Sequence, residues 1–192
     1  MKSDKCASAK CPMVRKPYPP GPKSKKRMRS FSEYAKELRE KQKLKRWYNL
    51  KEGQFGRYVK SVLNTRKRSE DAAVVLVKVL ESRLDNIVFR LGFAPSRNAA
   101  RKIVSHRHVT VNDKVVNIPS FSAKKGDRVG IKVMSSQKTL FKNLPAALKK
   151  HKPPLWLELN AEKLEGKVIG EPTIEEAAPP AEISSIFEFY SK

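Results

Sequence analysis

The sequence predicts an α+β fold with an extended basic N-terminal arm. Apolar residues recur at helical spacing from about residue 31 to residue 105, and short alternating segments typical of strands follow from residue 109. Residues 1–30 have no apolar period and are rich in proline and basic residues. The chain of 192 residues is long enough to form one large or two small domains.

Residues 1–30 are expected to form the arm, because proline restricts the backbone without continuing a helix. Such an arm would become ordered on a partner, and a solvated leader is the alternative interpretation. Its basic run supplies the first candidates for contact with a polyanion, Lys25, Lys26 and Arg27.

Two amphipathic helices are predicted after the arm. Ser30 and Glu33 have capping-box spacing, which predicts a helix from about Phe31 to Tyr48. After Gly53, a second helix is expected over Gln54–Asn64. The expected apolar side of the first helix is formed by Tyr34, Leu38, Trp47 and Tyr48. The candidate polyanion contacts on the two helices are Arg39, Lys43, Lys45, Arg46 and Arg57.

The strongest helical pattern runs from about Asp71 to Leu91 and predicts one continuous helix with a buried face. Gly92 follows at the position of a left-handed C-terminal cap. Ser96 can then cap a short helix over Arg97–Ser105, with Arg97 and Arg101 one turn apart on its outer face. The inner face of this helix is expected to contain Ala99, Ala100, Ile103 and Val104.

Strands predominate after residue 108. Val109–Val111 and Lys114–Val116 flank a two-residue Asn112-Asp113 turn and predict a β-hairpin. A further strand is expected over Val129–Val133, after the turn at residues 125–127. The remainder is expected to hold a basic helix over residues 135–152, strands at residues 155–157 and 167–169, an acidic proline-rich linker over residues 171–182, and an apolar segment over residues 183–190.

The charge of the chain points to a polyanionic partner. Its 42 Lys and Arg residues against 19 Asp and Glu residues give a net charge of +23. Nucleic acid is the expected partner, because each cation that meets a phosphate also releases condensed counterions. No apolar run approaches the ~18 residues of a membrane span, and the N-terminus has no hydrophobic leader. We therefore expect a cytoplasmic protein without a membrane partner.

Residues 96–116 gather the strongest candidates for RNA contact. A helix N-terminus offers free backbone N–H groups and a partial positive charge to phosphate. A basic surface with few aromatic residues suits RNA shape and phosphate contacts better than base stacking. A merely basic surface is the alternative. The candidates are Ser96, Arg97, Arg101, Lys102, His106, Arg107, His108, Asn112 and Lys114.

The stretch LESRLDNIVFRLGFAPSRNAARKIVSHRHVTVNDKVVNIPSFSAKKGD, at 80–127, resembles the small RNA-binding module of the fourth protein of the small ribosomal subunit. The same module is attached to pseudouridine synthases, a tyrosyl-tRNA synthetase and a heat-shock protein, so alone it indicates only RNA binding. The segments PYPPG and REKQKLKRWY and the final IFEFYSK are also similar to that ribosomal family. The resemblance therefore covers nearly the whole chain.

The resemblance implies two domains. A discontinuous all-helical domain would span residues 31–79 and be completed by residues 183–192, and a domain of helices on an antiparallel sheet would span residues 80–170, with the module at 80–131. It also implies a structural constituent of the small ribosomal subunit that binds small-subunit ribosomal RNA, nucleates assembly and contributes near the messenger entry to translational accuracy. Implied partners are this RNA, neighbouring ribosomal proteins and messenger RNA, with translational repression as a second role and no cofactor.

The sequence departs from the family at three places. Only Cys6 and Cys11 remain of four N-terminal cysteines that bind zinc in many members. Two thiolates cannot complete a closed four-coordinate zinc shell, so we interpret them as a vestigial pair; ligands supplied by a partner are the alternative. Arg107 replaces a glycine of the family, and the turn is Asn112-Asp113 in place of Asn-Gly, so both places carry a side chain where positive φ is expected.

Two other functions compete with a structural role. An RNA-modifying enzyme would need a separate catalytic domain, and the residues outside the module are few and basic. The chain contains no P-loop, G-x-S-x-G, H-E-x-x-H or G-x-G-x-x-G motif. We therefore expect no enzymatic activity. A free regulator that binds RNA reversibly would fit the basic arm equally well.

Overall fold

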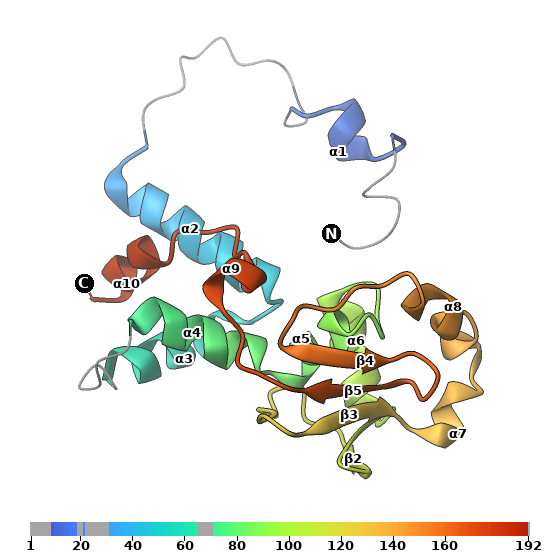
Figure 1. Cartoon of the computed structure of the whole chain (residues 1–192). Helices are drawn as coiled ribbons and strands as arrows, with labels where there is room; N and C mark the ends of the chain where they lie inside the picture. The colour runs from blue at the N-terminus through green and yellow to red at the C-terminus, as the bar shows by residue number, and fades with distance from the viewer. Residues whose placement is uncertain (1–8, 19–20, 22–30, 65–70, 192) are drawn as a thin grey trace.

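The computed structural model describes residues 9–18, 21, 31–64 and 71–191, most of which pack into two lobes (Figure 1). The helical lobe contains α2 (Glu33–Trp47), α3 (Glu52–Asn64), α4 (Ala72–Glu81), α9 (Ile174–Ala177) and α10 (Ile183–Ser191). The sheet lobe contains the remaining helices and all strands of the described residues, apart from the short α1 (Pro12–Arg15). The predicted α+β class is confirmed.

The helical lobe is discontinuous in sequence, as the resemblance implied. Helix α10 packs against α2 and α3, while α9 packs against α4 (Figure 1). Residues 171–182, expected to be a linker, therefore include a short packed helix, and Ala177 is buried. Fully buried apolar side chains of this lobe are Leu44, Phe55, Val59, Leu76, Val77, Leu80 and Ile186.

Glu52 ties three helices of this lobe together. Its carboxylate accepts hydrogen bonds from Lys41 Nζ at 2.7 Å, Lys45 Nζ at 2.8 Å and Tyr190 Oη at 2.9 Å. Burial alone would raise the pKa of Glu52, but these three donors lower it to about 2. The ionised carboxylate therefore joins the start of α3 to the second half of α2 and to the end of α10.

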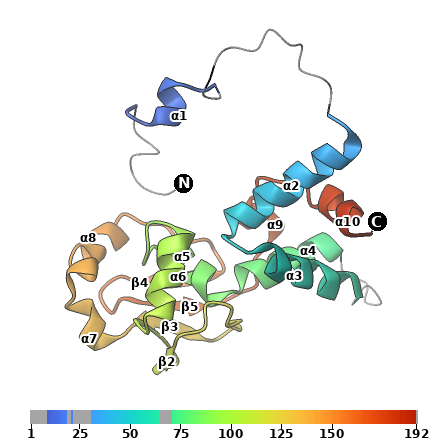
Figure 2. The same cartoon turned by 180° about the vertical axis from the view of Figure 1, so that it is seen from behind.

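The sheet lobe is built on a five-stranded antiparallel sheet in the order β2-β1-β3-β5-β4. The strands are β1 (Val109–Val111), β2 (Lys114–Val116), β3 (Arg128–Ile131), β4 (Leu157–Asn160) and β5 (Glu165–Val168). Helices α5 (Leu84–Arg90) and α6 (Arg97–Ser105) lie together over one face of the sheet (Figures 1 and 2). The core between them buries Ile87, Leu91, Ala100, Val104, Val109 and Val129.

The continuous helix expected over Asp71–Leu91 is wrong, because the chain breaks at Arg83. Arg83 has an extended backbone, φ −66° and ψ 138°, and forms an isolated bridge with Ser122. The N–H groups of the next two residues donate to carbonyls of the loop at residues 119–121. The helical spacing of apolar residues continues across this break, although α4 faces the core of the helical lobe and α5 faces the core of the sheet lobe. Gly92 has φ 82°, which confirms the predicted left-handed cap.

Other boundaries differ from the prediction. Helix α2 begins at Glu33, and its cap is Ser32, whose side chain accepts from Ala35 N; Ser30 lies outside the described residues. Gly53 lies within the first turn of α3 and does not precede it. The expected helix over residues 135–152 is three short helices. Lys138, which precedes the second, has an extended backbone, and Pro145 lies in the first turn of the third. The three helices are α7 (Val133–Ser136), η2 (Thr139–Phe141) and α8 (Leu144–Leu148).

The predicted hairpin is confirmed, with strands β1 and β2 joined by Asn112-Asp113. Both turn residues have positive φ, 49° and 66°, and Arg107 has φ 61°. The side chains that replace glycine therefore do sit in left-handed backbone, which costs about 1–2 kcal/mol per ordinary residue and less for Asn and Asp. No helix within the described ranges has the length and apolar character of a membrane span.

Candidate nucleic-acid interface

The two lobes meet at a buried polar network centred on Glu81, the last residue of α4. Its fully buried carboxylate accepts hydrogen bonds from Tyr48 Oη at 2.7 Å, Asn86 Nδ2 at 2.6 Å, and Arg90 Nε and Nη2 at 3.0 and 2.9 Å. Tyr48 follows α2, whereas Asn86 and Arg90 belong to α5. Burial, and then the charge of Glu81, raise the pKa of Tyr48, so the phenol remains a donor. The network fixes the end of α2 against α5.

The prediction that Arg97 lies on an outer face is wrong. Only 8% of its surface is exposed, and its Nε donates to Asn86 Oδ1 at 2.7 Å. Its guanidinium carbon lies 4.6 Å from the ring centre of Phe89, 4.8 Å from that of Trp47 and 5.0 Å from that of Tyr48. Burial lowers the pKa of Arg97 to about 10, which keeps it cationic at neutral pH.

The helical period explains this correction. Arg97, Ala100 and Val104 are separated by three and four residues, so they share one face of α6, and all three are buried. The sequence prediction assigned Arg97 to the exposed face because of its charge and not its phase. Arg101, half-buried, is also held by the fold, since its Nη1 donates to Asn49 O at 3.3 Å.

A hollow of about 580 Å³ opens where the end of α2 meets the start of α6. We call it the junction hollow. It is lined by Lys43, Arg46, Trp47, Asn49, Phe89, Pro95, Ser96, Arg97, Asn98 and Pro180. The structure thus brings together Lys43 and Arg46 from the first predicted helix with Ser96 and Arg97 from the module, about 50 residues later in the sequence.

The edge of the junction hollow carries two exposed cations. Lys43 forms an ion pair with Glu40 on the same helix, and the exposed guanidinium of Arg46 makes no hydrogen bond or ion pair with any residue that the structure describes. Ser96 caps α6 as predicted, and its Oγ accepts from Ala99 N at 3.2 Å. A phosphate at this edge would meet the free cation of Arg46 and the positive end of α6.

The remaining predicted residues of the first two helices do not join this hollow. Arg39 is exposed and lies over the ring of Phe31 at 3.3 Å. Lys45 is half-buried and paired with Glu52 at 2.8 Å. Arg57 is exposed on α3.

A second basic group lies at the other end of α6, about 13 Å away along nine residues. Lys102, His106 and Arg107 are exposed there. His108 is half-buried, and its Nδ1 lies 2.9 Å from Ser135 Oγ. Burial, followed by the charge of Lys138, lowers the pKa of His108, which favours the neutral imidazole.

The hairpin turn is held by the sheet and not by α6. Asn112 Nδ2 donates to Asp127 Oδ1 at 2.8 Å, and Asn112 Oδ1 accepts from Arg128 N at 2.9 Å. Asp113 pairs with Arg128 at 3.0 Å, and Lys114 is exposed. No hydrogen bond between described residues joins this turn to the start of α6. The predicted cluster is therefore not one hydrogen-bonded unit among the described residues.

Several predicted residues lie outside the described ranges, namely Lys25, Lys26, Arg27 and Cys6. Cys11 is described and buried. Within the described ranges, no three His, Cys, Asp or Glu side chains are grouped as a metal site would require.

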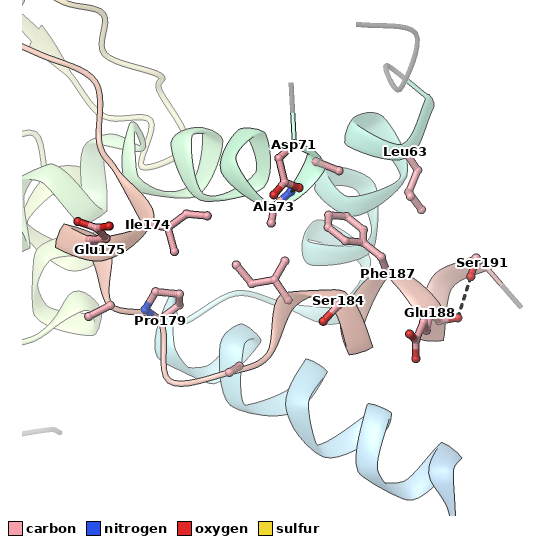
Figure 3. A pocket seen from close by; sticks show the side chains of 14 residues that line it. Leu63, Asp71, Ala73, Ile174, Glu175, Pro179, Ser184, Phe187, Glu188 and Ser191 are labelled. Atoms are coloured by element: carbon pink, nitrogen blue, oxygen red, sulfur yellow. Dashed lines mark hydrogen bonds between the residues drawn. The ribbon is translucent and has the colours of Figure 1, made fainter. Parts of the chain in front are cut away.

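A larger hollow, about 790 Å³, lies between α4 and the C-terminal helices (Figure 3). Figure 3 shows Phe187 and Ile174 directed toward it, with Asp71, Glu175 and Glu188 around it. None of its lining residues is Lys or Arg. It therefore differs in charge from the junction hollow and is no candidate for binding phosphate.

Six of the ten residues that line the junction hollow were not predicted as site residues, and Asn49, Trp47 and Asn98 are the three that carry polar or exposed aromatic groups. Asn49 has φ 54° and follows the basic helix, a position where Asn often forms a left-handed cap, so a local signal existed. Trp47 was assigned to the apolar side of α2, yet 36% of its surface is exposed. Its place beside Arg97, and that of Asn98, depend on tertiary contacts that no local pattern reveals.

Fold and site together define a protein in which a capped helix on an antiparallel sheet presents basic side chains. Comparison with known families agrees with this class. Residues 1–81 match the ribosomal protein S4/S9 N-terminal domain, and residues 82–129 match the S4 domain.

Curated relatives match over the full chain. The small ribosomal subunit protein uS4 of Caldicellulosiruptor bescii is 45% identical over 192 residues, covering 100% of this chain and 90% of the relative. The uS4 proteins of Thermus thermophilus and Kosmotoga olearia are 42% and 41% identical, with the same coverage. The chain belongs to the uS4 family of small-ribosomal-subunit proteins, and the predicted resemblance is confirmed.

Proposed function

We propose that this protein is a structural constituent of the small subunit of the cytoplasmic ribosome and binds small-subunit ribosomal RNA directly. The observation that carries the proposal is the junction hollow, where cations from two segments of the sequence meet the capped start of α6. A duplex or junction of RNA offers phosphates on several sides, and the two ends of α6 present cations to separate phosphates.

Rigidity of the interface supports direct binding. The Glu81 network holds α2 against α5, and Arg97 holds α6 against both through Asn86 and the rings around it. The helices that carry the exposed cations therefore keep fixed positions relative to one another before RNA arrives. A preformed surface loses little conformational entropy on binding, which suits an early role in assembly.

Finer roles of the family are part of the proposal. We propose that the protein nucleates subunit assembly, contacts neighbouring ribosomal proteins and lies near the messenger entry, where it influences accuracy. A second role as a translational repressor would use the same surface, because messenger RNA presents the same phosphates and 2′-hydroxyls. The acidic hollow between α4 and α10, unlike the basic faces, suits a basic protein neighbour.

We also propose that the protein acts without catalysis. The buried carboxylates nearest the interface are fully engaged, Glu81 by three side chains and Asp85 by Arg83 at 2.6 and 3.0 Å. A carboxyl group that acts as a general acid or base must be free to exchange a proton with substrate. A modification assay on bare ribosomal RNA should therefore show no turnover.

A binding titration tests the main proposal. Purified protein is expected to bind a small-subunit ribosomal RNA transcript one to one, and more tightly than a large-subunit transcript of equal length. The Lys102→Ala/Arg107→Ala double variant should bind more weakly, because both cations are exposed within the module. The matched control, Lys60→Ala/Lys163→Ala, removes two exposed charges elsewhere and should bind normally. Equal affinity for both transcripts would contradict the proposal.

A further inference from the structure

The junction hollow combines charge with aromatic surface. Lys43 and Arg46 stand on its edge, whereas Trp47, Phe89, Pro95 and Pro180 line it with rings. Its volume of about 580 Å³ falls within the ~300–1,000 Å³ of sites that enclose small molecules. Trp47 and Phe89 pack against Arg97, but contacts with phosphate alone would not need an open hollow beside these two aromatic rings.

A buried donor of Arg97 also favours a ligand in the hollow. The residue is more than nine-tenths buried and lines the hollow, yet its Nη2 has no hydrogen-bond partner among the described residues. Glu81 Oε1 lies 4.0 Å from it, which is an ion pair at long range but too far for a hydrogen bond. A buried donor without an acceptor is unfavourable, because it has lost its bond to water and gained none in return. Nη2 itself is closed to solvent, so a small shift of the side chains around it would let an acceptor in the hollow reach it and satisfy it.

Two side-chain amides complete the lining. Asn49 and Asn98 border the hollow, and neither amide makes a hydrogen bond to a residue that the structure describes. An amide group offers both donors and an acceptor, so it can pair with the polar edge of any nucleobase. The indole of Trp47, 36% exposed, supplies a flat surface for stacking.

We propose that the junction hollow receives one unpaired nucleotide of the ribosomal RNA, with its base stacked on Trp47 and its phosphate held at the edge by Arg46. The base edge faces the amides of Asn49 and Asn98, and an acceptor of the base or ribose meets Arg97 Nη2. This inference rests on the proposed function and adds to it a single-stranded contact, which the sequence alone argued against because aromatic residues are few.

Tryptophan fluorescence tests the stacking directly. The chain has two tryptophans, and Trp156 is buried with 4% exposed, so Trp156→Phe leaves Trp47 as the sole reporter. Titration of this variant with small-subunit ribosomal RNA is expected to quench the emission of Trp47, because a stacked base quenches indole. Inorganic polyphosphate, which supplies phosphate without bases, is expected to leave the emission nearly unchanged. Equal quenching by polyphosphate would overturn the proposal.

Affinity measurements provide the second test. Trp47→Leu is expected to weaken binding by about 5- to 100-fold, the loss of one stacked base, with no change in salt dependence. Trp47→Phe keeps an aromatic surface and should retain most of the affinity, and thermal melts should show both variants folded. Normal affinity of Trp47→Leu, while the unaltered protein binds this RNA tightly, would overturn the stacking alone. Failure of the unaltered protein to bind would overturn the proposed function as well.

Discussion

Replacement of Arg97 by alanine is expected to destabilise the fold, because this arginine is a structural element of the interface. The change removes the hydrogen bond from Nε to Asn86 Oδ1 at 2.7 Å, worth about 1.5–3 kcal/mol for a charged donor. It also removes the cation from between three aromatic rings, a contact worth up to about 2 kcal/mol when desolvated.

Two effects offset part of this loss. The buried guanidinium no longer has to be desolvated, and its repulsion by Arg90 disappears. Glu81 keeps its bonds from Tyr48 and Arg90, so no buried carboxylate is left unpaired. We therefore expect Arg97→Ala to lower the free energy of unfolding by about 2–4 kcal/mol, somewhat less than loss of a whole buried pair.

Urea unfolding followed by circular dichroism measures this change. Arg97→Lys is expected to recover only part of the stability, because an ammonium group lacks the planar fork that lies among the rings. The control is Lys102→Ala on the exposed side of the same helix, which should stay within about 0.5 kcal/mol of the unaltered protein. An Arg97→Ala variant as stable as this control, but weak in RNA binding, would refute the structural role.

Further predictions concern the core, the hairpin, acid stability and zinc. Leu84→Ala should cost about 2–5 kcal/mol in the same urea assay, because it opens a cavity at a fully buried position. Asp113→Gly should raise stability by less than about 1 kcal/mol, since residue 113 has φ 66° but Asp tolerates this region better than most residues and its exposed ion pair with Arg128 is lost; a loss of stability would contradict this. Glu52 has a folded-state pKa of about 2, so its contribution is complete above about pH 4.5 and should be lost as the pH falls toward 2. The acid transition of Glu52→Gln, followed by circular dichroism, should be correspondingly flatter. Elemental analysis of the isolated protein should find no stoichiometric zinc, because Cys6 and Cys11 supply two of the four ligands of a closed site, and one zinc per chain that is lost on Cys6→Ser would contradict this.

Local signals predicted the sheet lobe well. The Asn112-Asp113 turn, the Ser96 cap and the Gly92 cap depend on neighbouring residues alone, and all three are confirmed. The discontinuous helical lobe was predicted only through the resemblance, because nothing local pairs residues 183–191 with α2. The break at Arg83 was missed because the apolar period runs unchanged from a helix facing one core to a helix facing the other.

The candidate site was predicted in composition but not in geometry. Lys43, Arg46 and Ser96 were identified from charge and capping, and they do meet at one hollow. Arg97 was placed on the wrong face because a charged residue was assumed to be exposed, although its helical phase matches Ala100. The partners that make its burial possible are Asn86 and Phe89 of the preceding helix and Trp47 and Tyr48 at the end of α2, about 50 residues away, so only the tertiary structure brings them together.

We propose above that exposed cations around the two ends of α6 hold ribosomal RNA through its phosphates. The most direct test of this proposal is the affinity for small-subunit ribosomal RNA measured across a range of salt concentrations for the unaltered protein and for Arg46→Ala. The exposed guanidinium of Arg46 makes no hydrogen bond or ion pair among the described residues, so its loss should leave the free energy of unfolding nearly unchanged. Arg46→Ala is expected to bind this RNA more weakly, with a salt slope lower by about one unit. An unchanged affinity and slope would contradict the proposal.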